Sequence, residues 1–191
     1  MARIRVISAT PDGEAVPGGA QVQRDLAGIL AHTPEIRRGL SAFTQALKAN
    51  RTLTPRLVEL VRLRIAFHNQ CRSCMSIRYQ DAVADGVTED LVCSLERPAE
   101  ATDLTPAEVA ALRYADLFAT NHLAIDDTIY DDLRGHFTEA QIVELGLNCA
   151  LDVGVGRLAA TWDIVEALPE RFRQRGDEPV TPWGSDALVV S

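Results

Sequence analysis

Residues 53–74 read LTPRLVELVRLRIAFHNQCRSC, and this stretch decides the fold because a helix start is followed by a pair of cysteines. A threonine oxygen caps the free amides of a first helical turn, and proline at the next position loses no hydrogen bond there, so Thr54 and Pro55 mark a helix start. Apolar residues then recur at intervals of three and four, as in a helix. The Asn-Gln pair that follows propagates helices poorly, so we expect a second helix from about Cys71 to Gly86.

The same helix-start signal recurs along the chain and predicts an all-α protein. Threonine followed by proline, or by Glu or Gln three residues later, occurs at Thr33, Thr54, Thr105 and Thr138. No stretch alternates cleanly enough to predict a sheet. Leu-Thr-Pro at 53–55 and 104–106 indicates an internal helical repeat, although two similar hairpins by chance explain it equally well. We predict a helical bundle over residues 20–168, a loose segment at 1–19 and an extended tail at 169–191.

The composition is that of an ordinary globular protein. Of the 191 residues, 47% are apolar and 24% are charged, which is enough apolar material for a sizeable core. The net charge of −8 argues against nucleic acid or an anionic membrane as a partner, because either needs a basic surface. No apolar run approaches the roughly 20 residues that cross a bilayer, and the first residues show no secretory signal pattern. We therefore expect a cytoplasmic protein.

Cys71 and Cys74 have three interpretations: a redox pair, half of a metal site, or two inert core thiols. Residues three apart face the same way on a helix, and first-turn amides favour thiolate over thiol, which suits a reversible dithiol/disulfide couple. A zinc site needs four ligands, yet Cys93 and Cys149 are isolated on apolar stretches and no second Cys-x-x-Cys follows. Arg72, Ser73 and Arg78 give the pair a polar, electropositive setting, which argues against inert core thiols. We favour the redox pair.

Glu59 lies on the preceding helix, and its spacing from Cys71 suggests a second member of the site. A carboxylate that faces the thiols can take and return a proton during thiol chemistry. The alternative is a solvated glutamate paired with Arg56 or Arg62, both of which lie within helical contact distance.

Glu59, eleven intervening residues and Cys71-Arg-Ser-Cys74 resemble the alkylhydroperoxidase D family, within the carboxymuconolactone decarboxylase-like superfamily, over about residues 30–168. The resemblance implies an all-α fold and a homo-oligomer, a trimer or a dimer of trimers. It also implies that Cys74 attacks a hydroperoxide to become a sulfenic acid, that Cys71 resolves it into a disulfide, and that Glu59 relays protons. A dithiol, such as a lipoyl-bearing protein, would return the pair to the reduced state. No cofactor or metal is implied.

The chain departs from the family pattern after the second cysteine. The family places a histidine four residues later, where this chain has Arg78. Arginine stays protonated and cannot shuttle protons, but it can hold a thiolate by charge or clamp an acidic substrate group. His68 is the nearest imidazole, although a lone histidine near a helix end is more often a surface residue or a cap. Arg78 and His68 complete the candidate catalytic set.

These features predict a thiol-dependent oxidoreductase of antioxidant type that reduces hydroperoxides or disulfides. The first alternative is a lyase similar to carboxymuconolactone decarboxylase, whose chemistry needs no cysteine pair. The second alternative is a non-catalytic helical oligomer that carries a vestigial pair.

Overall fold

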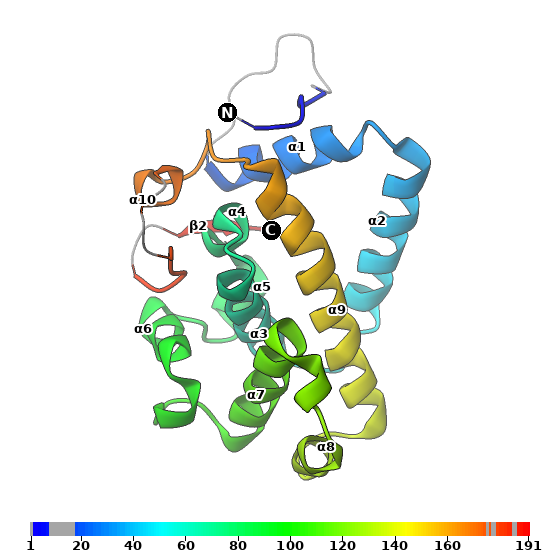
Figure 1. Ribbon diagram of the computed structural model, residues 1–191, viewed down its shortest axis with the longest axis vertical. Coiled ribbons are helices and arrows are strands. Elements are labelled where there is room, and N and C mark those ends of the chain that lie inside the picture. The colour runs from blue at the N-terminus through cyan, green and yellow to red at the C-terminus, as the bar shows by residue number, and fades with distance from the viewer. Residues whose placement is uncertain (1, 8–17, 175, 177–178, 185–186) are drawn as a thin grey trace.

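The computed structural model describes residues 2–7, 18–174, 176, 179–184 and 187–191, whose regular elements are helices apart from two short strands. The elements in chain order are α1 (Gly18–Leu30), α2 (Pro34–Ala49), α3 (Pro55–His68), α4 (Arg72–Met75), β1 (Ile77–Tyr79), α5 (Gln80–Ala84), α6 (Glu89–Cys93), η1 (Ser94–Glu96), η2 (Pro98–Glu100), α7 (Pro106–Thr120), η3 (His122–Ala124), α8 (Asp127–Arg134), α9 (Glu139–Trp162), α10 (Glu170–Arg173) and β2 (Leu188–Val190). The predicted all-α bundle is therefore confirmed. Figure 1 shows α9 crossing most of the molecule, with α2 on its outer flank and α8 at one end. None of the described helices is long and apolar enough to span a membrane.

The central helix of the bundle is α3, which packs against both α7 and α9. Its buried side chains are Leu57, Glu59, Leu60, Val61, Arg62, Leu63, Ile65 and Ala66. Because α3 is covered on more than one face, its apolar residues are not confined to one stripe. Glu59 and Arg62 therefore lie inside the bundle as a charged pair. The alternative interpretation of Glu59 is right about its pairing with Arg62 and wrong about its exposure to solvent.

Three of the four expected helix starts have the predicted caps. The Thr54 hydroxyl accepts a hydrogen bond from the amide of Leu57, and Thr105 and Thr138 form complete capping boxes. Thr33 makes no side-chain cap. Its hydroxyl instead donates to the carbonyl oxygen of Leu30 at 3.4 Å, so it closes the end of α1 and not the start of α2.

The predicted continuous helix from Cys71 to Gly86 is wrong. The chain forms the single turn α4, then β1, then the short helix α5. The reason is a tertiary contact that local sequence does not reveal: β1 pairs in parallel with β2, with Ile77 opposite Leu188. The amide of Leu188 also donates to the carbonyl oxygen of Ser76 at 2.7 Å. Strand pairing therefore replaces helical hydrogen bonds directly after the cysteines.

Residues near the C-terminus pack against the segment that carries the cysteines. The ring of Trp183 lies 4.9 Å from that of Phe67. In α1, a side chain at Gly19 would overlap Val190, since an added Cβ would lie 2.3 Å from the valine Cγ1. The segment 169–191, expected as an extended tail, thus contains α10 and β2 and contacts the body of the bundle.

Candidate redox site

Cys71 and Cys74 are joined by a disulfide bond. Cys71 is the N-cap of α4, and its sulfur accepts a hydrogen bond from the amide of Cys74 at 3.3 Å. Cys71 is fully buried, whereas Cys74 is partly exposed. The pair is therefore asymmetric, because an incoming molecule can reach Cys74 before it can reach Cys71.

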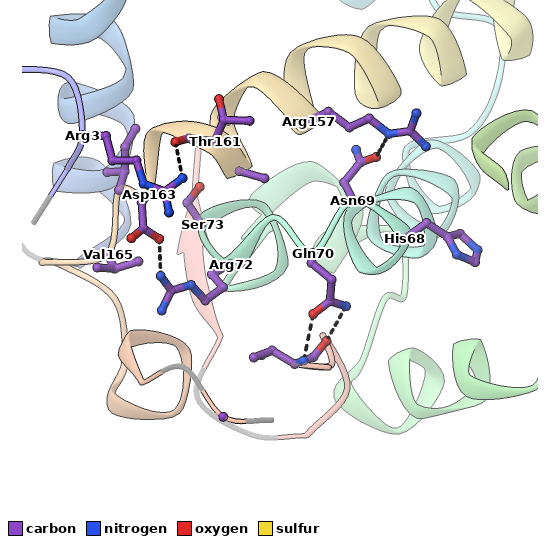
Figure 2. Close-up of a pocket in the computed structure, with 15 residues that line it drawn as sticks. Arg3, His68, Asn69, Gln70, Arg72, Ser73, Arg157, Thr161, Asp163 and Val165 are labelled. Carbon is purple, nitrogen blue, oxygen red and sulfur yellow. Dashed lines mark hydrogen bonds and ion pairs between the residues drawn. The ribbon is translucent and has the colours of Figure 1, made fainter. Parts of the chain in front are cut away.

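The turn before the pair is fixed by the residues that follow α10. Gln70 adopts φ of 49°, in the left-handed region that a non-glycine residue rarely occupies. Its side-chain amide donates to the carbonyl oxygen of Val180 at 3.1 Å and accepts from the amide of Val180 at 2.9 Å, as Figure 2 shows. This two-way contact ends α3 and brings Cys71 to the start of α4.

Glu59 and Arg62 form a buried, bidentate ion pair beneath the cysteines. Arg62 donates from Nε and Nη2 to the two oxygens of Glu59, at 2.7 Å each. The charge of Glu59 holds the pKa of Arg62 above its ordinary value even though burial acts to lower it. The same guanidinium donates to the carbonyl oxygens of Cys74 at 2.7 Å and Ile77 at 2.9 Å. Glu59 is thus linked to Cys74 through Arg62 and the backbone of residues 71–79, which we call the redox segment.

Arg78 is buried and its donors are directed away from the thiols. Nε and Nη2 donate to Glu89 at 2.9 and 3.0 Å, and Nη1 donates to the carbonyls of Met75 and Ile77. Nη2 also donates to the carbonyl oxygen of Pro182 at 2.6 Å. Burial holds the pKa of Arg78 below its ordinary value, although Glu89 acts to raise it. Arg78 therefore ties the redox segment to α6 and to the C-terminal residues.

His68 does not join the cysteines. Its Nε2 lies 2.6 Å from a carboxylate oxygen of Asp116, which also binds Arg64 at 2.6 Å. Burial acts to raise the pKa of Asp116, but hydrogen bonds from His68 and Arg64 hold it below the ordinary value. Of the candidate set, the structure brings together the cysteines and, through Arg62, Glu59; it separates His68 from them.

Cys74 opens into a cavity of about 540 Å³ between the first two helices and α9. Its apolar walls are Val22, Leu26, Ala27, Leu30, Leu40, Ala66, Ile77, Leu151, Val155, Ala159 and Ile164. Polar residues also line this space, namely Gln23, Arg37, Ser41, Thr44, Arg62, Asn69, Ser73, Tyr79 and Asp152, and neither Arg78 nor any histidine is among them. The cavity is therefore a mainly apolar pocket whose lining includes the Cys74 sulfur and a few charged groups.

Asp152 is the residue of this cavity that sequence reasoning missed. Burial raises the pKa of Asp152, the charge of Arg62 lowers it, and the charge of Glu59 raises it. The resulting pKa of Asp152 is about 7. The signal was present in the sequence: Asp152 is the one charged residue between Glu144 and Arg157, in an otherwise uncharged part of α9. An isolated acid in such a helical stretch indicates a carboxyl group that is partly covered by the core, and Asp152 is half-buried.

A second cavity, of about 600 Å³, lies beside the first and is not lined by either cysteine. Figure 2 shows its charged side chains engaged with their neighbours: Arg72 binds Asp163, and Arg157 binds Asn69 at 3.0 Å. His68 also lines this cavity. Among the residues that the structure describes, no cluster of His, Cys, Asp and Glu side chains has the arrangement of a metal site.

Residues 34–117, which include both cysteines, match the carboxymuconolactone decarboxylase family. An uncharacterized protein of Mycobacterium tuberculosis is 37% identical over 139 residues, which are 70% of this chain and 48% of that protein. The chain thus spans about half the length of that relative. The uncharacterized protein YdfG of Bacillus subtilis is 28% identical over 114 residues, which are 59% of this chain and 75% of YdfG.

Two solved structures are similar to this one. The alkylhydroperoxidase AhpD core of an uncharacterized peroxidase-related protein from Ralstonia eutropha has a TM-score of 0.65 and 20% identity, covering 92% of this chain and 100% of that one. A protein of unknown function from Agrobacterium tumefaciens, whose name suggests an antioxidant defence protein AhpD, has a TM-score of 0.61 and 22% identity, covering 71% of this chain and 92% of that one. These likenesses show the fold, and the family match spans the cysteine pair. Residues 34–117 are therefore similar to the carboxymuconolactone decarboxylase family, and the chain has an alkylhydroperoxidase D-like fold.

Proposed function

We propose that the protein reduces hydroperoxides through the Cys71–Cys74 dithiol. The observation that carries the proposal is the asymmetry of the pair: Cys74 opens into the apolar cavity, while Cys71 is buried within disulfide distance behind it. A substrate in the cavity meets one sulfur, and the second sulfur lies where it can resolve the product.

The chemistry is a two-electron reduction. The Cys74 thiolate attacks the terminal oxygen of the hydroperoxide, the O–O bond breaks, and an alcohol leaves with a proton. The resulting Cys74 sulfenic acid is attacked by the Cys71 sulfur, which forms the disulfide and releases water with the Cys71 thiol proton. A dithiol reductant, such as a lipoyl group on a protein, then reduces the disulfide and is itself oxidised to a disulfide.

The other predicted site residues take different roles in this proposal. Glu59 binds Arg62, and Arg62 donates a hydrogen bond to the Cys74 carbonyl oxygen that holds the redox segment. We therefore assign Glu59 as a positioning residue. Arg78 also positions the segment, because its donors are used by carbonyl groups and Glu89. His68 lies outside the cavity at Cys74 and has no step in the mechanism.

The test is hydroperoxide consumption with a dithiol reductant, for wild type, Cys74→Ser and Cys71→Ser. Wild type should form the Cys71–Cys74 disulfide under one equivalent of peroxide, detected by mass spectrometry. Cys74→Ser should be inactive, and Cys71→Ser should stop at a Cys74 sulfenic acid that a dimedone probe traps. A wild-type protein whose cysteines stay reduced under these conditions would falsify the proposal. Lactone decarboxylation that survives in Cys74→Ser would support the lyase alternative.

We also propose that the protein is a homo-oligomer. The described residues of α2 include no buried side chain, and Ile36 and Phe43 on this helix are exposed. Val143, Leu147 and Leu158 are exposed on α9. Apolar side chains gathered on two helices favour burial against further copies of the chain. Light scattering coupled to size-exclusion chromatography distinguishes the trimer or dimer of trimers from a monomer.

A further inference from the structure

The cavity at Cys74 has few groups that can exchange a proton. The ionisable side chains that line it, other than Cys74, are Arg37, Arg62, Tyr79 and Asp152. Arginine stays protonated in proteins. Burial raises the pKa of Tyr79, although Arg62 acts to lower it, so the phenol keeps its proton near neutral pH. Asp152 is the one carboxyl group in the lining of this cavity.

Glu59 is less suited to proton exchange with Cys74. Both of its oxygens accept from Arg62, and one also accepts from the amide of Tyr79 at 3.2 Å. Glu59 lines a smaller adjoining cavity of about 220 Å³ and not the one at Cys74. Protonating it would leave the buried Arg62 without a counter-charge, which is costly.

Asp152 lies at the junction of the two cavities, which it lines together with Arg62 and Tyr79. Its position on α9 is fixed against the redox segment, because Asn69 donates to the Asp152 carbonyl oxygen at 2.8 Å. Gly156 permits this approach, since a Cβ there would lie 2.7 Å from the Asn69 side-chain nitrogen. Asp152 and Cys74 line the same cavity.

We infer that Asp152 takes the proton of the Cys74 thiol and returns it to the departing alcohol. This inference rests on the proposed peroxidase function. The Cys74 S–H bond breaks as the Asp152 carboxylate gains the proton. The thiolate then attacks the hydroperoxide, the O–O bond breaks, and the alkoxide takes the proton from the Asp152 carboxyl group. Asp152 ends as a carboxylate, and Cys74 ends as a sulfenic acid.

The electrostatic setting supports this role. Burial raises the pKa of Asp152 to about 7, with opposing effects of Arg62 and Glu59, so both protonation states are populated at neutral pH. The other ionisable groups around the two cavities or coupled to this carboxyl are Arg37, Lys48, Arg51, Tyr79, Asp81 and Cys149. Burial and the charge of Asp152 both raise the pKa of Cys149, so this thiol stays protonated.

The experiment is a single turnover of the full-length reduced protein with an organic hydroperoxide, without reductant, followed as disulfide formation between about pH 5.5 and 9. The wild-type rate should rise as pH passes through about 7, as the carboxylate forms. Asp152→Asn should react on the order of 100-fold more slowly and lose this limb of the profile, and Asp152→Glu should restore part of the rate. The matched control is Asp132→Asn, an exposed change on α8 that should leave both rate and profile unchanged.

A second measurement follows the carboxyl group itself. In ¹³C-Asp-labelled protein, one carboxyl resonance should titrate near pH 7 and be absent from Asp152→Asn. If wild type forms no disulfide, the proposed function fails. If wild type reacts but Asp152→Asn keeps its rate and pH profile, the inference about Asp152 fails and the proposed function stands.

Discussion

The guanidinium of Arg78 donates a hydrogen bond to the carbonyl oxygen of Pro182 at 2.6 Å, although 104 residues separate them in the chain. A guanidinium has five N–H groups, and the carbonyls of Met75, Ile77 and Pro182 together with Glu89 accept all of them. The residue that stands where the family has a histidine thus joins the redox segment to distant parts of the chain.

Replacing Arg78 by histidine should therefore destabilise the protein without adding a proton shuttle. The change leaves three carbonyls and Glu89 without their donor, and the free energy of unfolding should fall by about 3 kcal/mol or more. Urea unfolding measures the loss, and single-turnover kinetics with hydroperoxide should show no gain in rate. A stable Arg78→His variant that reacts faster than wild type would show that the site lacks only a histidine.

The Glu59→Gln variant should be strongly destabilised because it leaves Arg62 buried without a counter-charge. We expect a loss of about 3–5 kcal/mol in the free energy of unfolding, measured in urea. Glu35→Gln is the matched control, since Glu35 pairs with Arg38 on the surface of α2 and should change stability by less than about 0.5 kcal/mol. Equal losses in the free energy of unfolding for the two substitutions would show that the Glu59–Arg62 ion pair does not stabilise the fold.

Asp152 should make stability depend on pH in a direction opposite to that of most carboxylates. Its pKa is raised from the ordinary 3.8 to about 7, so the folded state favours the protonated carboxyl group. Stability from this group is complete below about pH 4 and is lost as pH rises through about 7. Asp152→Asn removes the dependence, so above pH 7 the variant should be roughly 2–4 kcal/mol more stable than wild type.

This comparison uses oxidised protein, unfolded in urea at pH 4 and at pH 8. The variant and wild type should have similar stability at the lower pH and diverge at the higher one. A constant difference at both values would show that Asp152 does not titrate in this range.

The two cysteines should differ in their reaction with a thiol reagent. In reduced protein, Cys74 should react with a maleimide on the order of tenfold or more faster than Cys71, because Cys71 is fully buried. Peptide mapping separates these sites from Cys93, which is exposed, and Cys149, which is buried. Equal labelling of Cys71 and Cys74 would remove the asymmetry on which the proposed function rests.

Breaking the pairing of β1 with β2 should loosen the redox segment. Leu188→Pro removes the amide that donates to Ser76, whereas Leu188→Ala keeps the amide and shortens the side chain. Hydrogen exchange at the amide of Arg78, the middle residue of β1, should be faster in the proline variant than in the alanine variant. Exchange that is equal in the two variants would show that the backbone pairing does not hold this segment.

The sequence predicted the parts of the fold that rest on local interactions. Threonine caps at 54, 105 and 138 were predictable because the capping hydrogen bonds join residues three apart. The break after Met75 was not, because it depends on a strand that lies more than a hundred residues further along the chain. Thr33 shows the same limit on a small scale, since its hydroxyl turns back to the preceding helix.

The parts of the candidate site that form a short sequence motif could be predicted from the sequence. The Cys-x-x-Cys spacing predicted the cysteine pair, and the number of residues between Glu59 and Cys71 predicted Glu59. The partner of Glu59 inside the bundle and the occupied donors of Arg78 depend on burial, which spacing alone does not specify. Asp152 has no motif, and its relation to Cys74 exists only once α9 lies beside α4.

The contacts of Gln70 with Val180 also bear on how the protein is made. Because 110 residues separate these two positions, Cys71 and Cys74 emerge from the ribosome long before the residues that fix their turn. At about 5–20 residues per second, the delay is on the order of 5–20 s. During that interval the surrounding thiol pool determines whether the nascent cysteine pair is oxidised or reduced. The folded structure can influence the oxidation state of the pair only after Val180 has been synthesised and has bound Gln70.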